Sequence, residues 1–211
     1  MTEDIRNTIA RRAARLLPDG AYVNLGIGLP TLVANFIPAD REIIFHSENG
    51  LLGLGPAPDE TNYDPEMINA GKAPVTLLKG GAIFHHNDAF LMIRGGHLDY
   101  ALLGAFQVSA RGDLANWATA GDNKAPAVGG AMDLAAGARE VWALMEHVTK
   151  SGAPRILEEC SYPLTAAGVV TRIFTDLATI TVEDGLVVEE MAEGVTFEAL
   201  QAVTGARLRR R

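Results

Sequence analysis

The sequence predicts an α/β fold: a single open, mainly parallel sheet flanked by helices, with an antiparallel hairpin near the C-terminus. Short apolar runs typical of buried strands alternate with segments of helical periodicity along the 211 residues. Many of the 22 glycines gather where apolar runs end, which is where an open α/β sheet has its ligand crevice. No internal repeat and no linker rich in proline or serine interrupts the sequence, so one domain is expected over residues 1–211.

The N-terminal part predicts a helix, a strand, a turn and a second helix. The first helix stops before Gly20, and its apolar residues recur at helical spacing: Ile5, Ile9, Ala13 and Leu16. A short strand at residues 22–25 leads into a turn with Gly26 and Gly28. Pro30 suits the first position of the second helix, because its φ angle fits and its missing N–H is not needed there.

The middle of the sequence predicts several strands and one short helix. A strand at residues 42–45 precedes the turn at residues 47–50. A helix at residues 65–70 is expected to end at Gly71. Four other apolar runs are bounded by glycine, proline or charge and are predicted to be strands: residues 75–78, 91–93, 100–103 and 141–145.

The C-terminal part predicts a hairpin and a helix. Residues 177–191 contain two β-rich runs around Asp184 and Gly185, a pattern typical of an antiparallel hairpin. This hairpin would add antiparallel strands to the edge of a mainly parallel sheet. The final helix is expected over residues 196–203, before Gly205.

The charge of the chain argues against nucleic acid as a ligand. The formal net charge is -8 and the pI is about 5.1, whereas binding to a phosphate backbone requires clustered Lys and Arg. Basic runs occur near the ends, at residues 11–12 and 207–211, and are expected on the solvated surface. An anionic ligand must therefore be held by backbone amides and a few isolated cations, such as Lys72, Lys79 and Arg94.

The distribution of apolar residues predicts no membrane segment. No apolar run reaches the roughly 18 residues that a membrane-spanning helix needs. The N-terminal segment mixes charged with apolar residues, unlike a secretory signal. A cytoplasmic location is therefore expected.

The spacing of potential ligands predicts no metal site. His85 and His86, with Asp88 and His97, come closest to a cluster, but adjacent histidines on a strand point to opposite faces. Neither the HxxxH nor the HExxH spacing occurs. Cys160 is the single cysteine, which excludes an internal disulfide and a cysteine-rich zinc site, and it is expected to be a small buried apolar residue.

Other common catalytic and binding motifs have little support. His46 and His147 stand beside apolar runs and are expected to be satisfied core or rim histidines. The serine-hydrolase elbow G-x-S-x-G does not occur. Gly26 and Gly28 could begin a dinucleotide motif, but Pro30 follows and the third glycine is missing. The glycine pair still offers backbone amides to an anion.

Glu48 is the residue with two open interpretations. Its neighbours Ser47, Asn49 and Gly50 are turn formers, so a hydrated turn glutamate is the simpler interpretation. Its place at the expected C-terminal end of a strand makes it a catalytic candidate, because open α/β folds carry their chemistry there. The residues alone leave both interpretations open.

At Glu48 the sequence resembles the B subunits of the 3-oxoacid CoA-transferases, whose mark is S-E-N-G followed by two apolar residues and a small one, here at residues 47–53. Similar stretches follow in the family's order over nearly the whole chain, among them NLGIGLP at 24–30, INAGK at 68–72, RGGHLD at 94–99 and GGAMDL at 129–134. Residues 55–58, 84–88 and 109–117 look most like the branch that acts on 3-oxoadipate with succinyl-CoA. Acetoacetate, acetate and butyrate enzymes share the same framework.

The resemblance implies a CoA-transferase-like fold and a role for Glu48 as the nucleophile. It implies a ping-pong reaction through a mixed anhydride and a glutamyl-CoA thioester, so neither ATP nor a metal is needed. Coenzyme A is then a substrate, and no cofactor is expected. A backbone N–H at Gly130 would stabilise the oxyanion, and Asn49 would shape the turn. The second oxyanion donor is expected from the A subunit of the CoA-transferase.

The resemblance also suggests contacts with the acyl-CoA and carboxylic acid substrates. Gly26 and Gly28 would let the backbone pass close to the substrate, and Lys72 would place a cation near it. Fold-maintaining turns and a surface lysine explain the same residues equally well. The pocket around Glu48 is expected to be closed and largely apolar, because water would hydrolyse the intermediates.

The resemblance implies an obligate complex with the CoA-transferase A subunit, as a heterodimer or heterotetramer, with the active site at the interface between the two chains. Two other functions stay open. An acyl-CoA hydrolase on the same scaffold would use water as the final acceptor. A non-catalytic ligand sensor or structural subunit would keep the fold without the reaction, although the intact turn at residues 47–50 speaks against it.

Overall fold

The computed structural model describes residues 3–61, 63–119 and 128–211. Its centre is a group of five strands with the same direction, in the spatial order β10 (Val170–Phe174), β8 (Glu140–Leu144), β5 (Tyr100–Gly104), β1 (Tyr22–Leu25) and β2 (Ile44–Ser47). Each neighbouring pair in this group is parallel. The C-terminal ends of the five strands therefore lie along one edge of the sheet.

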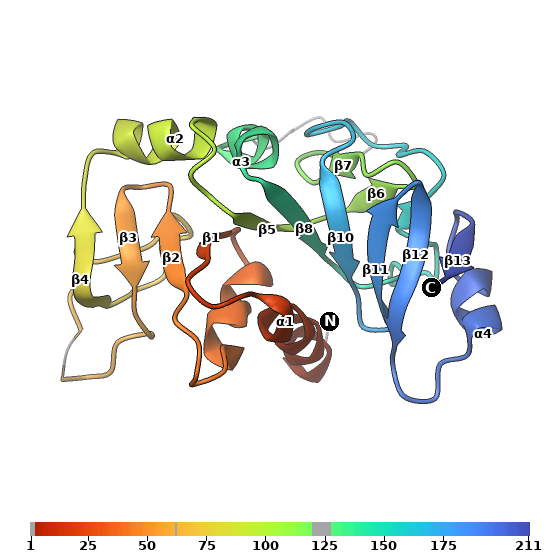
Figure 1. Ribbon diagram of the computed structural model, residues 1–211, viewed down its shortest axis with the longest axis horizontal. Helices are drawn as coiled ribbons and strands as arrows, with labels where there is room; N and C mark the ends of the chain where they lie inside the picture. The colour runs from red at the N-terminus through yellow and green to blue at the C-terminus, as the bar shows by residue number, and fades with distance from the viewer. Residues whose placement is uncertain (1–2, 62, 120–127) are drawn as a thin grey trace.

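Antiparallel strands extend this group on both sides. Beside β2 lie β3 (Leu51–Leu54) and then β4 (Leu77–Ile83). Beyond β10 lie the strands of the predicted C-terminal hairpin, followed by a strand parallel to the second of them: β11 (Ala178–Glu183), β12 (Gly185–Met191) and β13 (Leu208–Arg210). Together they form one ten-stranded sheet (Figure 1). The predicted α/β fold is confirmed.

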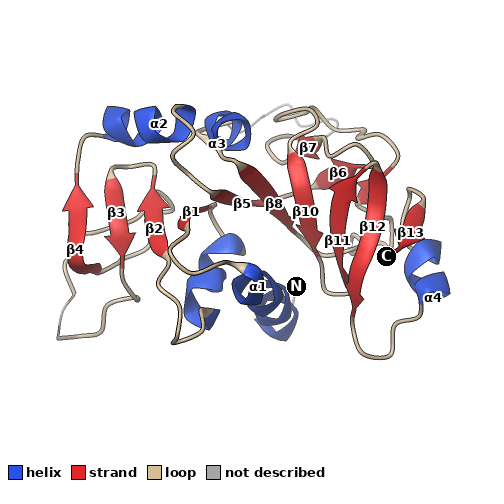
Figure 2. Cartoon of the chain, viewed as in Figure 1, coloured by secondary structure: helices blue, strands red, loops and turns tan. Residues whose placement is uncertain are grey.

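Helices cover both faces of the large sheet. One face packs against α2 (His86–Arg94) and α3 (Ala131–Gly137), and the other packs against α1 (Glu3–Leu16) and the 3₁₀ helix η1 (Pro30–Phe36). A short helix, α4 (Phe197–Ala202), precedes β13. A small sheet is formed by β7 (Leu114–Ala115), β6 (Gln107–Ser109) and β9 (Ile156–Leu157), of which β6 and β7 are labelled in Figure 2. None of the described helices has the length and apolar character needed to span a membrane.

The two faces of the sheet belong to two hydrophobic cores. On β5, Ala101 and Leu103 pack in the core that contains α2 and α3, whereas Leu102 packs in the core that contains α1 and η1. The same alternation holds on β8, where Trp142 points toward α1. Strands that are buried on both faces consist of continuous apolar runs. The positions of β5 and β8 were therefore predicted well from the sequence.

Two local predictions are wrong. Residues 65–70 form turns and an isolated bridge between Ile68 and Pro74 rather than a helix. Residues 91–93 lie inside α2 rather than in a strand. The side chain of His85 accepts a hydrogen bond from a backbone N–H in the first turn of α2 and so begins this helix.

Several strands differ from the prediction or were not predicted. β2 begins and ends two residues beyond the predicted strand, and β4 begins at Leu77 rather than at residue 75. The strands β3, β10 and β13 and the small sheet were not identified from the sequence. The prediction of one domain over residues 1–211 stays a prediction, although the large sheet contains strands from both halves of the chain.

Arg12 corrects the expectation that both basic runs lie on the solvated surface. Its side chain is buried between α1 and the turn after β10, where Nη1 donates to the carbonyl oxygens of Thr175 at 2.8 Å and Asp176 at 3.2 Å. Burial lowers the pKa of this guanidinium. Arg11 stays exposed, with its Cζ atom 4.9 Å from the centre of the Phe36 ring, and the C-terminal arginines are exposed as expected.

His147 is the fully buried histidine that joins the end of β8 to the C-terminal region. Its Nδ1 atom lies 3.0 Å from Thr175 Oγ1, and its Nε2 atom lies 2.8 Å from Thr204 Oγ1. The His147 backbone N–H donates to the carboxylate of Asp176 at 2.8 Å. Burial lowers the pKa of His147 to about 4, so the ring is neutral at pH 7, and the predicted core role is confirmed.

The depressed pKa of His147 predicts a loss of stability in mild acid. The unfolded chain binds a proton near pH 6.5, whereas the folded chain binds it only near pH 4, so the free energy of unfolding falls as the pH falls through this window. His147→Asn should remove roughly 3 kcal/mol of this pH dependence, measured by urea unfolding at several pH values. The exposed His97 supplies the control His97→Asn. Equal pH dependence in wild type and His147→Asn would contradict this explanation.

Candidate active site

Glu48 is the first residue of the tight turn that joins β2 to β3. Because β2 ends at Ser47, Glu48 stands at the C-terminal edge of the parallel strands. The Gly50 N–H donates to the carbonyl oxygen of Ser47 at 3.0 Å, and Gly50 has a φ of 107°. A Cβ atom added at Gly50 would lie 2.1 Å from the carbonyl oxygen of Phe84, so only glycine fits this turn.

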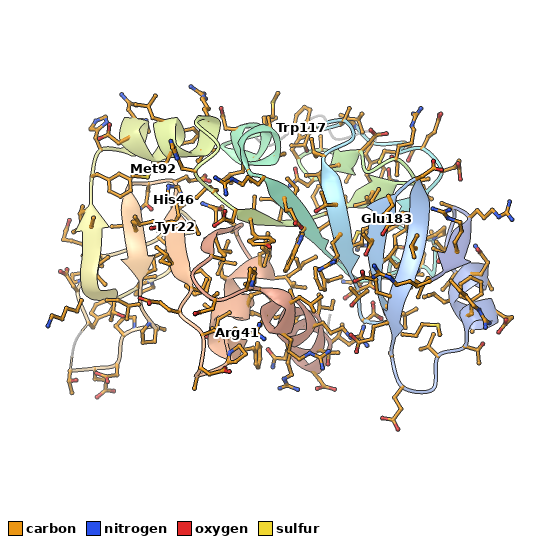
Figure 3. All side chains as sticks on the ribbon, viewed as in Figure 1. Tyr22, Arg41, His46, Met92, Trp117 and Glu183 are labelled. Carbon is orange, nitrogen blue, oxygen red and sulfur yellow. The ribbon has the colours of Figure 1, made fainter. Side chains whose placement is uncertain are left out.

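His46 anchors the strand that carries Glu48. Its ring is buried on the side of the sheet that faces α2, where it borders the same cavity as Met92 (Figure 3). The side-chain amide of Asn24 on β1 donates to His46 Nδ1 at 3.0 Å and to the His46 carbonyl oxygen at 3.3 Å. Burial lowers the pKa of His46 to about 4, so the ring is neutral at pH 7. The predicted position in the core is confirmed, but Nε2 is buried without a hydrogen-bond partner among the described residues, so the histidine is not fully satisfied as expected.

The carboxylate of Glu48 lies against the backbone of Gly130, which directly precedes α3. A Cβ atom added at Gly130 would lie 2.9 Å from Glu48 Oε2 and 3.0 Å from Glu48 Oε1. Glu48 is half-buried, whereas Gly130 is buried. Two candidates from distant parts of the sequence therefore meet at one point.

Burial is the main influence on the charge of Glu48. It raises the pKa of this carboxyl group, and the negative charge of Asp133 on α3 raises it further. A carboxylate that is poorly solvated in its ionised form is more basic than one in water. It is consequently a better nucleophile, provided that it remains ionised at the working pH.

Asn49 and Ser47 connect the turn to the loop at residues 68–72. The side-chain amide of Asn49 donates to the carbonyl oxygen of Ile68 at 2.7 Å, and the Ala70 N–H donates to Ser47 Oγ at 2.9 Å. Lys72 lies two residues further on, exposed and with a φ of 63°. The loop that carries Lys72 is thus attached to the turn that carries Glu48.

Gly26 and Gly28 lie beyond the end of β1, near the same loop. The Gly26 N–H donates to the carbonyl oxygen of Leu102 at 2.8 Å, and an added Cβ atom would lie 3.0 Å from that oxygen. The approach of β5 is thus sufficient to explain glycine at position 26. Gly28 is exposed, with a φ of 89° and free space around an added Cβ atom. The side chain of Ile27 contacts Gly71, since an added Cβ atom at Gly71 would lie 3.6 Å from it.

A cavity of about 770 Å³ lies between η1 and the loop that carries Lys72. Its lining is mainly apolar and includes Ile27, Phe45, Ser47 and Ala70, but it does not include Glu48. The expected closed, apolar pocket around Glu48 is therefore not formed by the described residues. The carboxylate projects toward α3, and the cavity lies beside the residue that precedes it.

The described residues contain no group of three or more His, Cys, Asp and Glu side chains able to hold a metal ion. His85 and His86 lie at the start of α2 rather than on a strand. The expectation that a strand would point their side chains to opposite faces of a sheet was therefore wrong. Cys160 is half-buried, less than expected, and its Sγ lies 3.6 Å from the carbonyl oxygen of Asp113. Burial, aided by the charge of Asp113, raises the pKa of the thiol to about 11.

Asp133 was not identified from the sequence, and Arg94 was misjudged. Arg94 is not an isolated cation, because its Nε atom donates to Asp133 Oδ1 at 2.6 Å. Asp133 follows Gly130 by three residues, and an acidic residue in the first turn of a helix was a signal that could have found it. The partnership with Arg94 spans two helices, and the local sequence gives no sign of it.

Comparisons with known proteins identify the family of this chain. The coenzyme A transferase family matches residues 6–202. The B subunit of the 3-oxoadipate CoA-transferase of Acinetobacter baylyi is 56% identical over 204 residues, which cover 96% of this chain and 94% of that protein. The B subunit of the succinyl-CoA:3-ketoacid coenzyme A transferase of Helicobacter pylori is 47% identical over 203 residues, covering 96% of this chain and 97% of that protein.

A solved structure has the same fold. The acyl-CoA transferase of Escherichia coli O157:H7, in its apoenzyme form, superposes with a TM-score of 0.79 at 21% sequence identity. The superposition covers 100% of this chain but 42% of the longer E. coli chain. At this identity the likeness concerns the fold, whereas the family match and the A. baylyi and H. pylori relatives concern the sequence itself. The chain belongs to the coenzyme A transferase family.

Proposed function

We propose that this chain is the B subunit of a two-subunit CoA-transferase, which moves CoA from succinyl-CoA to the carboxylate of a 3-oxo acid through a thioester on Glu48. The observation that carries the proposal is the contact of a half-buried carboxylate at a strand end with the backbone of Gly130. The names of the A. baylyi and H. pylori relatives support the partner and the substrate class. A cytoplasmic location stays a prediction from the sequence.

The proposed reaction uses the carboxylate as the nucleophile. A Glu48 oxygen attacks the thioester carbonyl, the C–S bond breaks, and a mixed anhydride and CoA thiolate result. The thiolate then attacks the Glu48 carbonyl carbon, which releases the donor's carboxylate and leaves a glutamyl-CoA thioester. A second carboxylate repeats the two steps in reverse and departs as the new CoA ester, so the energy of the thioester is retained without ATP or a metal.

The surroundings of Glu48 suit these steps in two ways. Each acyl transfer places negative charge on a carbonyl oxygen, which a backbone N–H at Gly130 would stabilise. The contact of the Glu48 carboxylate with the Gly130 backbone supports this role. Burial raises the pKa of Glu48, which increases its nucleophilicity. The incomplete burial of Glu48 in this chain also supports a partner: the A subunit would supply the second oxyanion donor and exclude water.

The substrate is proposed to be 3-oxoadipate, with acetoacetate as the next choice. The 3-oxoadipate enzyme subunit of A. baylyi is 56% identical to this chain, and the 3-ketoacid enzyme subunit of H. pylori is 47% identical. Lys72 would lie near the CoA moiety, because its loop is hydrogen-bonded to the turn of Glu48 through Asn49 and Ser47. Gly26 and Gly28 would face the same substrate from the end of β1.

Glu48→Gln is expected to abolish the covalent intermediate. An amide is a poor nucleophile, so turnover should fall on the order of a thousandfold or more. Mass spectrometry of the assembled enzyme after incubation with succinyl-CoA should find a CoA-sized adduct on the wild-type Glu48 peptide, removable by hydroxylamine, and none in the variant. Glu60→Gln, in the exposed segment after β3, is the control and should keep the adduct. A competent wild-type complex without the adduct would refute the mechanism.

Gly130→Ala is expected to slow thioester formation while the protein stays folded. The added methyl group would press on the end of the flexible Glu48 side chain, so the carboxylate must move and the stability should change little. Single-turnover rates should fall roughly 10- to 100-fold, the size of effect expected when one oxyanion contact is disturbed. Gly104→Ala, where an added Cβ atom meets nothing within 4 Å, is the matched control. Equal rates in Gly130→Ala and wild type would argue against a role for this contact.

The assembly and the substrate can be tested together. The isolated chain should show little turnover, and co-expression with the partner chain of the enzyme should restore it, because half of the pocket is missing without that partner. With succinyl-CoA as the donor, kcat/KM should be higher for 3-oxoadipate than for acetoacetate. Consumption of acyl-CoA without any carboxylate acceptor would favour the hydrolase instead, and normal turnover by Glu48→Ala would favour a non-catalytic role.

A further inference from the structure

The ion pair between Arg94 and Asp133 lies next to the contact between Glu48 and Gly130. We propose that Arg94 is a positioning residue for Glu48: through Asp133 it holds the first turn of α3, and with it Gly130, in a fixed place against the nucleophile. Arg94 stands at the C-terminal end of α2, and Asp133 stands in the first turn of α3. The inference rests on the proposed function of Glu48.

Two contacts fix α3 on α2. Arg94 Nε donates to Asp133 Oδ1 at 2.6 Å, near the start of α3. At the other end of α3, a Cβ atom added at Gly137 would lie 2.3 Å from the carbonyl oxygen of Ile93, so the two backbones touch. The Gly137 contact holds the far end of α3, and the ion pair with Arg94 holds the first turn, next to Gly130.

The same pair controls the charge that Glu48 experiences. The carboxylate of Asp133 raises the pKa of Glu48, after the larger effect of burial. Arg94 lies on Asp133, and a cation there offsets part of the negative field. Loss of Arg94 would leave the negative charge of Asp133 uncompensated beside Glu48 and raise the pKa of Glu48. Loss of Asp133 would remove that negative charge and lower the pKa of Glu48.

The other charged or titratable groups near Glu48 do not take over this role. His46, two residues earlier on β2, is neutral at pH 7 because burial lowers its pKa to about 4. His85 precedes α2, next to Phe84, whose carbonyl oxygen packs against Gly50. Lys72 lies on the loop joined to the turn through Asn49. Within the described residues, Asp133 is the one charged group that raises the pKa of Glu48.

A purely structural role for the pair would have a different signature. The side chain of Arg94 is 65% exposed and that of Asp133 is 24% exposed, and such surface pairs contribute about 1 kcal/mol or less to stability. The pair Arg139–Asp99 matches it closely, at 2.9 Å with 68% and 28% exposure, but it joins the N-terminal ends of β8 and β5. Arg139→Gln therefore removes an equivalent surface ion pair away from Glu48.

The test is the rate of Glu48 thioester formation from succinyl-CoA in single turnover, measured from about pH 4.5 to pH 8 with the assembled two-subunit enzyme. The substrate is the same for every variant, so its own titration cancels in the comparison. Arg94→Gln should move the acid limb of the profile to higher pH and lower the rate on that limb roughly threefold, and Asp133→Asn should move the limb to lower pH. Arg94→Lys should restore most of the wild-type profile.

The double variant Arg94→Gln/Asp133→Asn should resemble Asp133→Asn, because Arg94 acts through Asp133. Arg139→Gln should keep the wild-type profile. Identical profiles for Arg94→Gln and Arg139→Gln, or shifts of Arg94→Gln and Asp133→Asn in the same direction, would overturn the inference. A wild-type enzyme that forms no Glu48 adduct at any pH would instead refute the proposed function, so the two failures are distinguishable.

Discussion

The contact between a carboxylate and a glycine backbone is the constraint on which the rest of the site depends. Glu48 lies at the end of a central strand, and Gly130 lies at the start of a helix on one face of the sheet. A Cβ atom added at Gly130 would lie about 3 Å from the Glu48 carboxylate, so a side chain at position 130 would displace that carboxylate. Both β2 and α3 must therefore be rigidly placed, and the sheet order, the buried His46 and the packing of α3 on α2 all serve this placement.

This placement has an energetic cost that the fold tolerates. Partial burial disfavours the ionised form of Glu48, so a charged Glu48 opposes folding slightly rather than supporting it. The turn beside it also requires a positive φ at Gly50. Two well-packed cores of apolar side chains flank the sheet and supply the stability that this site lacks. Unfavourable local choices of this kind are common where a protein carries its chemistry.

The central features of the fold could be predicted from the sequence because each depends on a local pattern of apolar residues and turn residues. β1, β5 and β8 are short apolar runs between charges and glycines, and the C-terminal hairpin is marked by Asp184 and Gly185. Residues 65–70 were wrongly predicted to form a helix because helix propensity does not include tertiary contacts. Two hydrogen bonds join this segment to the turn of Glu48 instead. The apolar run at 91–93 was too short to distinguish a strand from part of a helix.

The candidate site was likewise predicted where a local motif marks its residues, and missed where the contact joins distant segments. Glu48, Asn49 and Gly130 came from motifs that stand at particular positions, whereas the pairing of Arg94 with Asp133 joins two helices and has no local trace. Strand order has a related consequence for folding. β1 lies between β2 and β5, so Val23 pairs with Phe45 close by in sequence and with Tyr100 much further along. The turn of Glu48 joins strands that are adjacent in sequence, whereas the approach of Gly130 depends on strands that are far apart in sequence, and non-local pairing of this kind slows folding. The turn that carries Glu48 is thus built from local contacts, whereas the segment that covers its carboxylate is placed by the rest of the sheet.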